Sequence, residues 1–263
     1  FDQNISSWTT TSVTDMAFMF FASSVFNQNI STWNVANVTD MTAMFAGATL
    51  FNQPIGAWTT SSVALMNTMF SGASVFNGDI SLWNVGSVTN MESMFANASS
   101  FNRQLLWNVS NVTNMGSMFS NADAFNQSLN SWVTTSVTNM SYMFSDNNVF
   151  NGSISSWNVS SVLNMSRMFE NADSFNQSLN LWVTSSVTNM SSMFANNGAF
   201  NGDITSWNTS SVSSMNRMFD SAVAFNKDLS GWTVNPNVTD CANFDTTTTA
   251  WVLARPSFTS CTI

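Results

Sequence analysis

The 263-residue sequence has no histidine, three prolines, one tyrosine and only five basic residues. Without histidine, Ser–His–Asp triads, imidazole proton shuttles and histidine metal sites cannot form. A net charge of −9 with so few basic side chains argues against nucleic acid or an anionic membrane surface as a partner. No apolar run approaches the roughly 20 residues that span a bilayer. We therefore expect no nucleic-acid binding and no membrane insertion by this segment.

Charged residues are also scarce, at 7% of the chain, against about 25% in an ordinary soluble domain. The apolar fraction of 44% is near normal, so serine, threonine and asparagine fill the difference. The carboxylates are scattered, whereas acid–base catalysis needs two that converge in different environments. We expect a polar, mostly uncharged surface, no enzyme activity, and no catalytic, cofactor-binding or metal-binding residues.

What is abundant is repetition. Tryptophan recurs every 25 residues from Trp8 to Trp232, with one deletion before Trp107, and a Phe-Asn step keeps the same period. All 18 methionines lie in an M-x-x-M-F element that occurs nine times, once in each unit except the last. A unit of this size cannot bury its apolar face alone, so we expect about ten units to stack around one continuous core.

Within one unit, Met190, Met193, Phe194 and Asn197 have the i, i+3, i+4, i+7 spacing of one helical face. Thr188, or Ser186 before it, is a plausible N-cap. This pattern predicts a helix of about two turns.

The segment from Leu179 to Thr184 carries aromatic and β-branched residues and predicts one short strand. The expected fold class is therefore an α/β solenoid of about ten 25-residue strand-plus-short-helix repeats. The expected division is a repeat solenoid over 1–244 and a C-terminal cap over 245–263.

The phrases "SVTNMxxMF" and "FNxxIxxWNV" resemble the BspA-like leucine-rich repeats, the DUF285 family of surface proteins, over about residues 1–245. The resemblance implies a leucine-rich-repeat-like, right-handed coil. It also implies an extracellular, adhesive or host-facing role.

The two ends differ. Cys241 replaces the first methionine of the last unit, and a bridge to Cys261 would fold the tail over that unit as a cap; a reduced structural pair is the alternative. The chain opens on Phe1 with no polar segment before the first unit. We expect upstream units in a precursor or, alternatively, another molecule covering this edge.

Several residues have both a structural and a functional interpretation. Asp79, Asp203 and Asp228 are expected in solvated turns, with a calcium ladder as the alternative. The methionines are expected in the core rather than at copper(I). The asparagine after each phenylalanine, such as Asn201, is expected to point inward and bond to the turn backbone.

Fifteen N-x-[ST] sequons occur, and Asn37, Asn111 and Asn237 are the expected glycosylation sites of a secreted protein. Those on the supposedly inward asparagines, Asn126, Asn151 and Asn176, are expected to be inaccessible.

We expect an extracellular or cell-surface, non-enzymatic repeat protein for adhesion, binding or matrix structure, with protein or glycan ligands or with self-association. One alternative is a subunit of an extracellular filament or surface layer. Another is an ice- or polysaccharide-binding solenoid that uses threonine and serine rows such as Thr9 to Thr11, Thr59 to Ser61 and Thr134 to Ser136.

Overall fold

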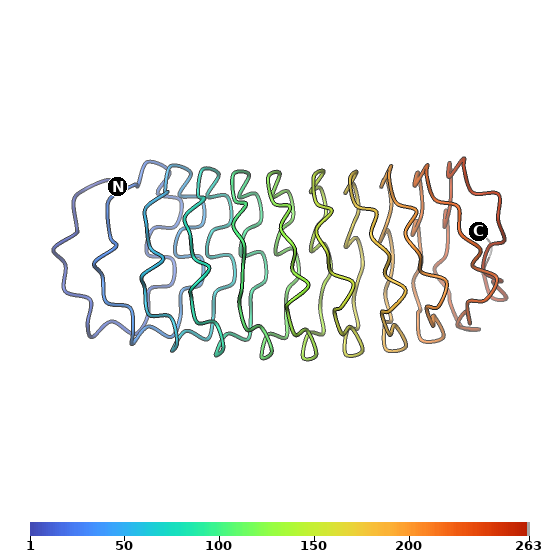
Figure 1. Cartoon of the computed structure of the whole chain (residues 1–263), viewed down its shortest axis with the longest axis horizontal. Coiled ribbons are helices and arrows are strands. Elements are labelled where there is room, and N and C mark those ends of the chain that lie inside the picture. The colour runs from blue at the N-terminus through green and yellow to red at the C-terminus, as the bar shows by residue number, and fades with distance from the viewer. Residues whose placement is uncertain (262–263) are drawn as a thin grey trace.

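The computed structural model describes residues 1–261 and shows a row of similar loops stacked along one long axis, from the N-terminal to the C-terminal end (Figure 1). We call each loop a coil and begin it at the Phe-Asn step. The coils span 1–25, 26–50, 51–75, 76–100, 101–124, 125–149, 150–174, 175–199, 200–224 and 225–250, and a tail follows.

Neither predicted element is present. Within residues 1–261 there is no α-helix, and the only β-pairing is nine isolated parallel bridges, from Asp15–Asp40 to Ser214–Asp240. The expected α/β solenoid of strand-plus-short-helix, leucine-rich-repeat-like coils is therefore wrong. In the segment predicted as a strand, the Trp182 N–H instead turns back to the Leu179 carbonyl at 3.0 Å.

The segment predicted as a helix is a chain of tight turns, which we call the turn segment (190–197 in the eighth coil). Ser192 and Asn196 have φ values of +54° and +56°, whereas an α-helix needs φ near −63°. The Met193 N–H donates to the Met190 carbonyl at 3.2 Å across Ser192, the pattern of a type II turn. The intervening amides of Ser192 and Phe194 donate to the next coil, to Asn216 and Met218.

The expected N-cap has a different role. The Thr188 N–H donates to Leu163 of the preceding coil at 2.8 Å. Asn189 then accepts the Ser191 N–H on its side-chain oxygen at 2.9 Å, an Asx turn that opens the turn segment. The polar residues before the methionines therefore join coils and start turns rather than cap a helix.

The observed turn segment places inward the same side chains that the predicted helix would have placed inward. Met190, Met193, Phe194 and Asn197 are all fully buried. All methionines except Met19 are buried, as expected for core residues. The i, i+3, i+4, i+7 pattern thus identified the core correctly and its backbone incorrectly.

Aromatic rings fill the core in three parallel files, two of phenylalanine and one of tryptophan. Phe194 stacks on Phe200 with ring centroids 3.9 Å apart, and on Phe169 of the preceding coil at 5.6 Å. Trp207 stacks on Trp182 at 6.2 Å, and its indole N–H donates to the Leu179 carbonyl at 2.9 Å. The buried indole is therefore satisfied by the neighbouring coil, as buried tryptophans usually are.

The asparagine ladder exists but lies on the surface. The Asn176 side-chain oxygen accepts the Asn201 N–H at 2.8 Å, and Asn201 in turn accepts the Asn226 N–H at 3.0 Å. The expectation of a bonded ladder is confirmed, whereas its inward direction is wrong, because Asn126, Asn151 and Asn176 are exposed. Their sequons are accessible, contrary to expectation.

At the C-terminal end, Cys241 and Cys261 form a disulfide, which confirms the predicted pairing. Trp251 interrupts the parallel ring files by packing edge-on against Phe219 and Phe225, with interplanar angles of 74° and 86°. Phe258 packs edge-on against Phe244. The tail therefore covers the last coil and is covalently fastened to it.

Candidate functional site

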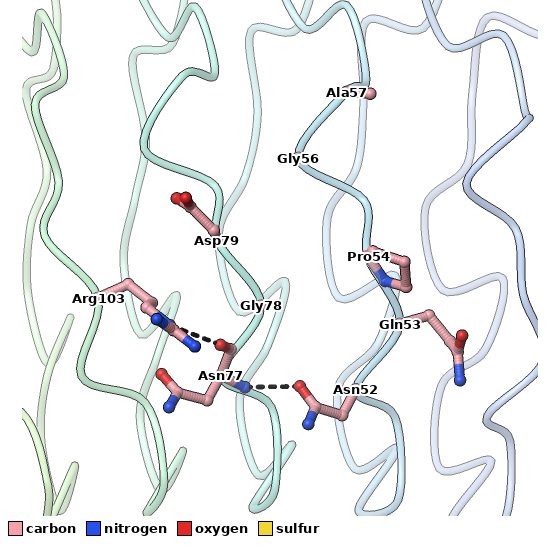
Figure 2. A pocket seen from close by; sticks show the side chains of 9 residues that line it. All are labelled: Asn52, Gln53, Pro54, Gly56, Ala57, Asn77, Gly78, Asp79 and Arg103. Atoms are coloured by element: carbon pink, nitrogen blue, oxygen red, sulfur yellow. Dashed lines mark hydrogen bonds between the residues drawn. The ribbon is translucent and has the colours of Figure 1, made fainter.

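A shallow, open groove of about 460 Å³ crosses the third, fourth and fifth coils on the face that carries the asparagine ladder (Figure 2). Its volume lies in the range of about 300–1,000 Å³ that small-molecule sites commonly have. The lining residues are Asn52, Gln53, Pro54, Gly56, Ala57, Asn77, Gly78, Asp79 and Arg103.

The groove is hollow because its floor has short side chains. At Gly56, a Cβ would lie 2.2 Å from the Asp79 carbonyl oxygen, so only glycine allows the two coils to approach this closely. At Gly78, a Cβ would lie 3.0 Å from the Phe76 ring. Pro54 and Ala57 add small apolar surfaces beside these glycines.

Polar groups converge above this floor. The Arg103 Nε donates to the Asn77 carbonyl at 2.8 Å, which holds the guanidinium at the rim. The Asn52 side-chain oxygen accepts the Asn77 N–H at 3.0 Å. Within residues 1–261 the amide NH₂ groups of Asn52 and Asn77 have no protein partner. The groove therefore offers amide and guanidinium donors beside the Asp79 carboxylate, a set suited to hydroxyl groups.

Hydrogen bonds from the Ser81 backbone N–H and hydroxyl, aided by the nearby Arg103 guanidinium, lower the pKa of Asp79. The carboxylate accepts the Ser81 N–H at 3.0 Å. The backbone N–H and hydroxyl of Thr205 lower the pKa of Asp203 in the same way. The hydroxyl and backbone N–H of Ser230 lower the pKa of Asp228. These aspartates lie in surface turns, as expected. Across the described chain, no group of three His, Cys, Asp or Glu side chains could hold a metal ion.

These lowered pKa values predict acid sensitivity. A carboxyl whose folded pKa lies below its ordinary value of 3.8 stabilises the fold above that pH, and the contribution is lost as the pH falls through the lowered pKa. The melting temperature should therefore drop between about pH 4 and pH 2. Asp203→Asn, which keeps an acceptor for Thr205, should reduce this drop in pH-dependent thermal melts. Asp123→Asn, at an exposed carboxylate with no hydrogen bond inside residues 1–261, is the control; equal slopes for both variants would contradict the assignment.

The expected glycosylation sites lie on the surface. Asn37, Asn111 and Asn237 are exposed. The Asn37 amide donates to the Thr11 carbonyl at 2.8 Å, and the Asn111 amide to Gly86 at 2.7 Å. Because an N-linked amide retains one N–H, these bonds and a glycan are compatible. Glycosylation of the three residues stays a prediction.

The threonine rows are not continuous surfaces. Thr10, Thr60 and Thr134, one in each row, are buried. The Thr134 hydroxyl donates to the Asn158 carbonyl at 2.8 Å, and Thr60 bonds to Asn84 in the same way. The alternation of W-T-T or W-V-T units with W-N-V units therefore provides a hydrogen bond between paired coils.

The groove is not predicted by the sequence. Its elements come from three coils, and Arg103 and Asp79 line the same groove only because one coil lies against the next. The available signal was local: Pro54, Gly56 and Gly78 give consecutive units an unusually small return segment.

Comparison of this sequence with known protein families agrees with the repeat pattern. A family described as "Mycoplasma protein of unknown function, DUF285" matches residues 1–106, 104–186 and 154–251. The chain belongs to the DUF285 family. No curated protein matches this DUF285 chain. Solved structures with some similarity include a TLR13–ssRNA13 complex, at 7% identity and a TM-score of 0.24; the alignment covers 89% of the DUF285 chain and 48% of the other. The DUF285 chain thus spans about half of that protein's length, and so low a score carries no argument. The described residues contain no helix able to cross a membrane.

Proposed function

We propose that this DUF285 chain is a non-catalytic adhesion or binding protein of the cell surface or extracellular matrix, related to the BspA-like surface proteins. The groove is proposed to bind a sugar residue of a glycan ligand. The observation that carries the proposal is the meeting of unpartnered amide donors, the Arg103 guanidinium and the Asp79 carboxylate over a small apolar floor. Sugar hydroxyls both donate and accept hydrogen bonds, so they match such a mixed set.

Two further features support the proposal. The Cys241–Cys261 disulfide suits an oxidising compartment, where such bonds persist. Stacked repeats also present broad side faces for binding, and here these faces carry mainly uncharged polar groups.

The test is binding to an array of immobilised oligosaccharides, comparing two phenylalanine variants. Ala57→Phe fills the groove from an exposed position, whereas Ser131→Phe adds the same ring at the equivalent exposed position of the sixth coil. We expect Ala57→Phe to weaken retention about tenfold or more, corresponding to about 1.4 kcal/mol, and Ser131→Phe to bind like wild type. Absence of any retained glycan, or equal binding by both variants, would overturn the proposed site.

A further inference from the structure

A second surface carries side chains of a different kind. Each turn segment has two residues with positive φ. The side chain of the first one faces outward in several coils, and we call the row of these positions along the stack the display row. In the sixth to ninth coils these residues are Tyr142, Arg167, Ser192 and Arg217, with φ values of +58°, +57°, +54° and +55°. Tyr142, Arg167 and Arg217 are exposed, whereas Ser192 between the two arginines is buried. In the second to fifth coils they are the buried Ala43 and the half-buried Thr68, Ser93 and Ser117. Phe18 holds this position in the first coil, with φ of +58° and 58% exposure. The small residues of the second to fifth coils therefore separate Phe18 from the larger side chains of Tyr142, Arg167 and Arg217.

Hydrogen bonds between coils hold neighbouring positions of the display row side by side. The Tyr142 N–H donates to Ser166 at 2.9 Å, and the Arg167 N–H donates to Ser191 at 2.8 Å, so adjacent coils lie at hydrogen-bonding distance at this position. With about 4.8 Å between hydrogen-bonded chains, Arg167 and Arg217 lie about 10 Å apart along the stack.

Each arginine is oriented by a carboxylate three residues later. Arg167 pairs with Glu170 at 3.1 Å, and Arg217 pairs with Asp220 at 2.8 Å. The arginine side chains are 44% and 46% exposed, whereas their partners are only 11% and 13% exposed. The guanidinium groups therefore cover the carboxylates and face outward, and each retains N–H groups with no partner inside residues 1–261.

Tyr142 adds an aromatic surface at one end of the pair. The Arg167 guanidinium lies over its ring, 5.4 Å from the centroid. Tyr142 remains 39% exposed. A bulky side chain is unfavourable at positive φ, where glycine or asparagine is preferred, so Tyr142 brings no local benefit to its turn.

We propose that the display row from Tyr142 to Arg217 binds an extended, uncharged polysaccharide lying along the stack axis. The aromatic ring packs against a sugar face, and the arginine–carboxylate pairs hydrogen-bond to hydroxyl groups farther along the chain. The inference concerns a different face from the groove and does not depend on the proposed function of the groove.

Charge and backbone geometry select this ligand. The arginines are already neutralised by Glu170 and Asp220, and Asp146 beside them is negative, so the patch does not attract a polyanion, and the net charge of −9 repels one. A peptide could not add to this face as a strand, because amides of the turn segments already bond to the next coil. Binding groups about 10 Å apart along the stack axis also match an extended chain better than a curved one.

The test compares two glucose oligomers by calorimetry, cellohexaose, which is extended, and maltohexaose, which is curved. The protein carries Ala57→Phe, which fills the groove, so that binding reports the display row alone. We expect cellohexaose to bind at least about tenfold tighter than maltohexaose. Tyr142→Ala and Arg217→Gln should each weaken binding about tenfold, the loss expected for one stacking or charged hydrogen-bond contact. Thr68→Ala, in the same position of the third coil, should have no effect.

Three outcomes would overturn the inference: no binding of cellohexaose, equal binding of the two oligomers, or tighter binding of polygalacturonate, which would indicate an anion site. Thermal melts of each variant establish that it is folded. Charge-conserving Ser93→Arg with Arg217→Ser gives a second check, since it moves the second arginine three coils from Arg167. Cellohexaose binding should fall about tenfold in this double variant, and unchanged binding would contradict recognition by spacing.

Discussion

Phe144→Ala is expected to lower the free energy of unfolding by about 3–5 kcal/mol, the cost of a large cavity in a packed core. Phe144 is fully buried and stacks on Phe150 with ring centroids 3.8 Å apart. It also stacks on Phe119 and Phe169 of the coils on either side, each at 5.7 Å. The substitution therefore removes contacts from two coil interfaces at once.

Because each coil contacts only its neighbours, this loss should weaken the coupling between the two halves of the stack. Urea unfolding followed by circular dichroism measures the free energy. Hydrogen exchange should become faster first in the coils on either side of residue 144. Leu163→Ala, at a side chain that is 49% exposed, is the control and should change stability by less than about 0.5 kcal/mol. A loss below about 1 kcal/mol for Phe144→Ala would show that the ring files are not the main stabilising element.

Gly202→Ala is expected to destabilise the fold by about 3 kcal/mol or more, although it adds one methyl group. A Cβ on Gly202 would lie 2.1 Å from the Gln177 carbonyl oxygen and 2.9 Å from the Phe200 ring. The first neighbour is backbone and the second is a core side chain, so neither moves easily. The eighth and ninth coils would have to separate locally.

Gly231→Ala is the matched control, because a Cβ there meets nothing within 4 Å. It should leave stability unchanged or raise it by about 0.4–1 kcal/mol through a smaller unfolded-state entropy. Thermal and urea melts of both variants decide the matter. If the two variants melt alike, the close approach of the coils at Gly202 is not a structural requirement.

The sequence predicts which side chains of this fold are buried better than it predicts the backbone conformation. The side chains that point inward could be identified from spacing alone, because burial of Met190, Met193 and Phe194 depends on their positions within a period. The backbone that places them inward could not. A helix and a file of type II turns both satisfy an i, i+3, i+4 pattern, and the turn residues here include serine and arginine, which carry no strong turn signal.

The two proposed binding surfaces are hard to predict from the sequence, because they depend on contacts between neighbouring coils. Asp79 was visible as an isolated carboxylate in a turn, but its neighbour Arg103 comes from the next coil. Arg167 and Tyr142 are 25 residues apart in sequence and in contact through the stack. A motif search along the chain does not detect pairs of this kind, since each residue alone resembles an ordinary surface substitution.

The sequence by itself determined the 25-residue unit, the apolar residues of the core, the disulfide partners and the polar, weakly charged surface, since periodicity and composition record the burial of apolar side chains directly. Only the tertiary structure decided between helix and turns. The amides of Ser192 and Phe194 find their acceptors in the following coil, at Asn216 and Met218, rather than four residues back. Hydrogen bonds between neighbouring coils therefore set the local conformation, and the same stacking brings together the groove and the display row.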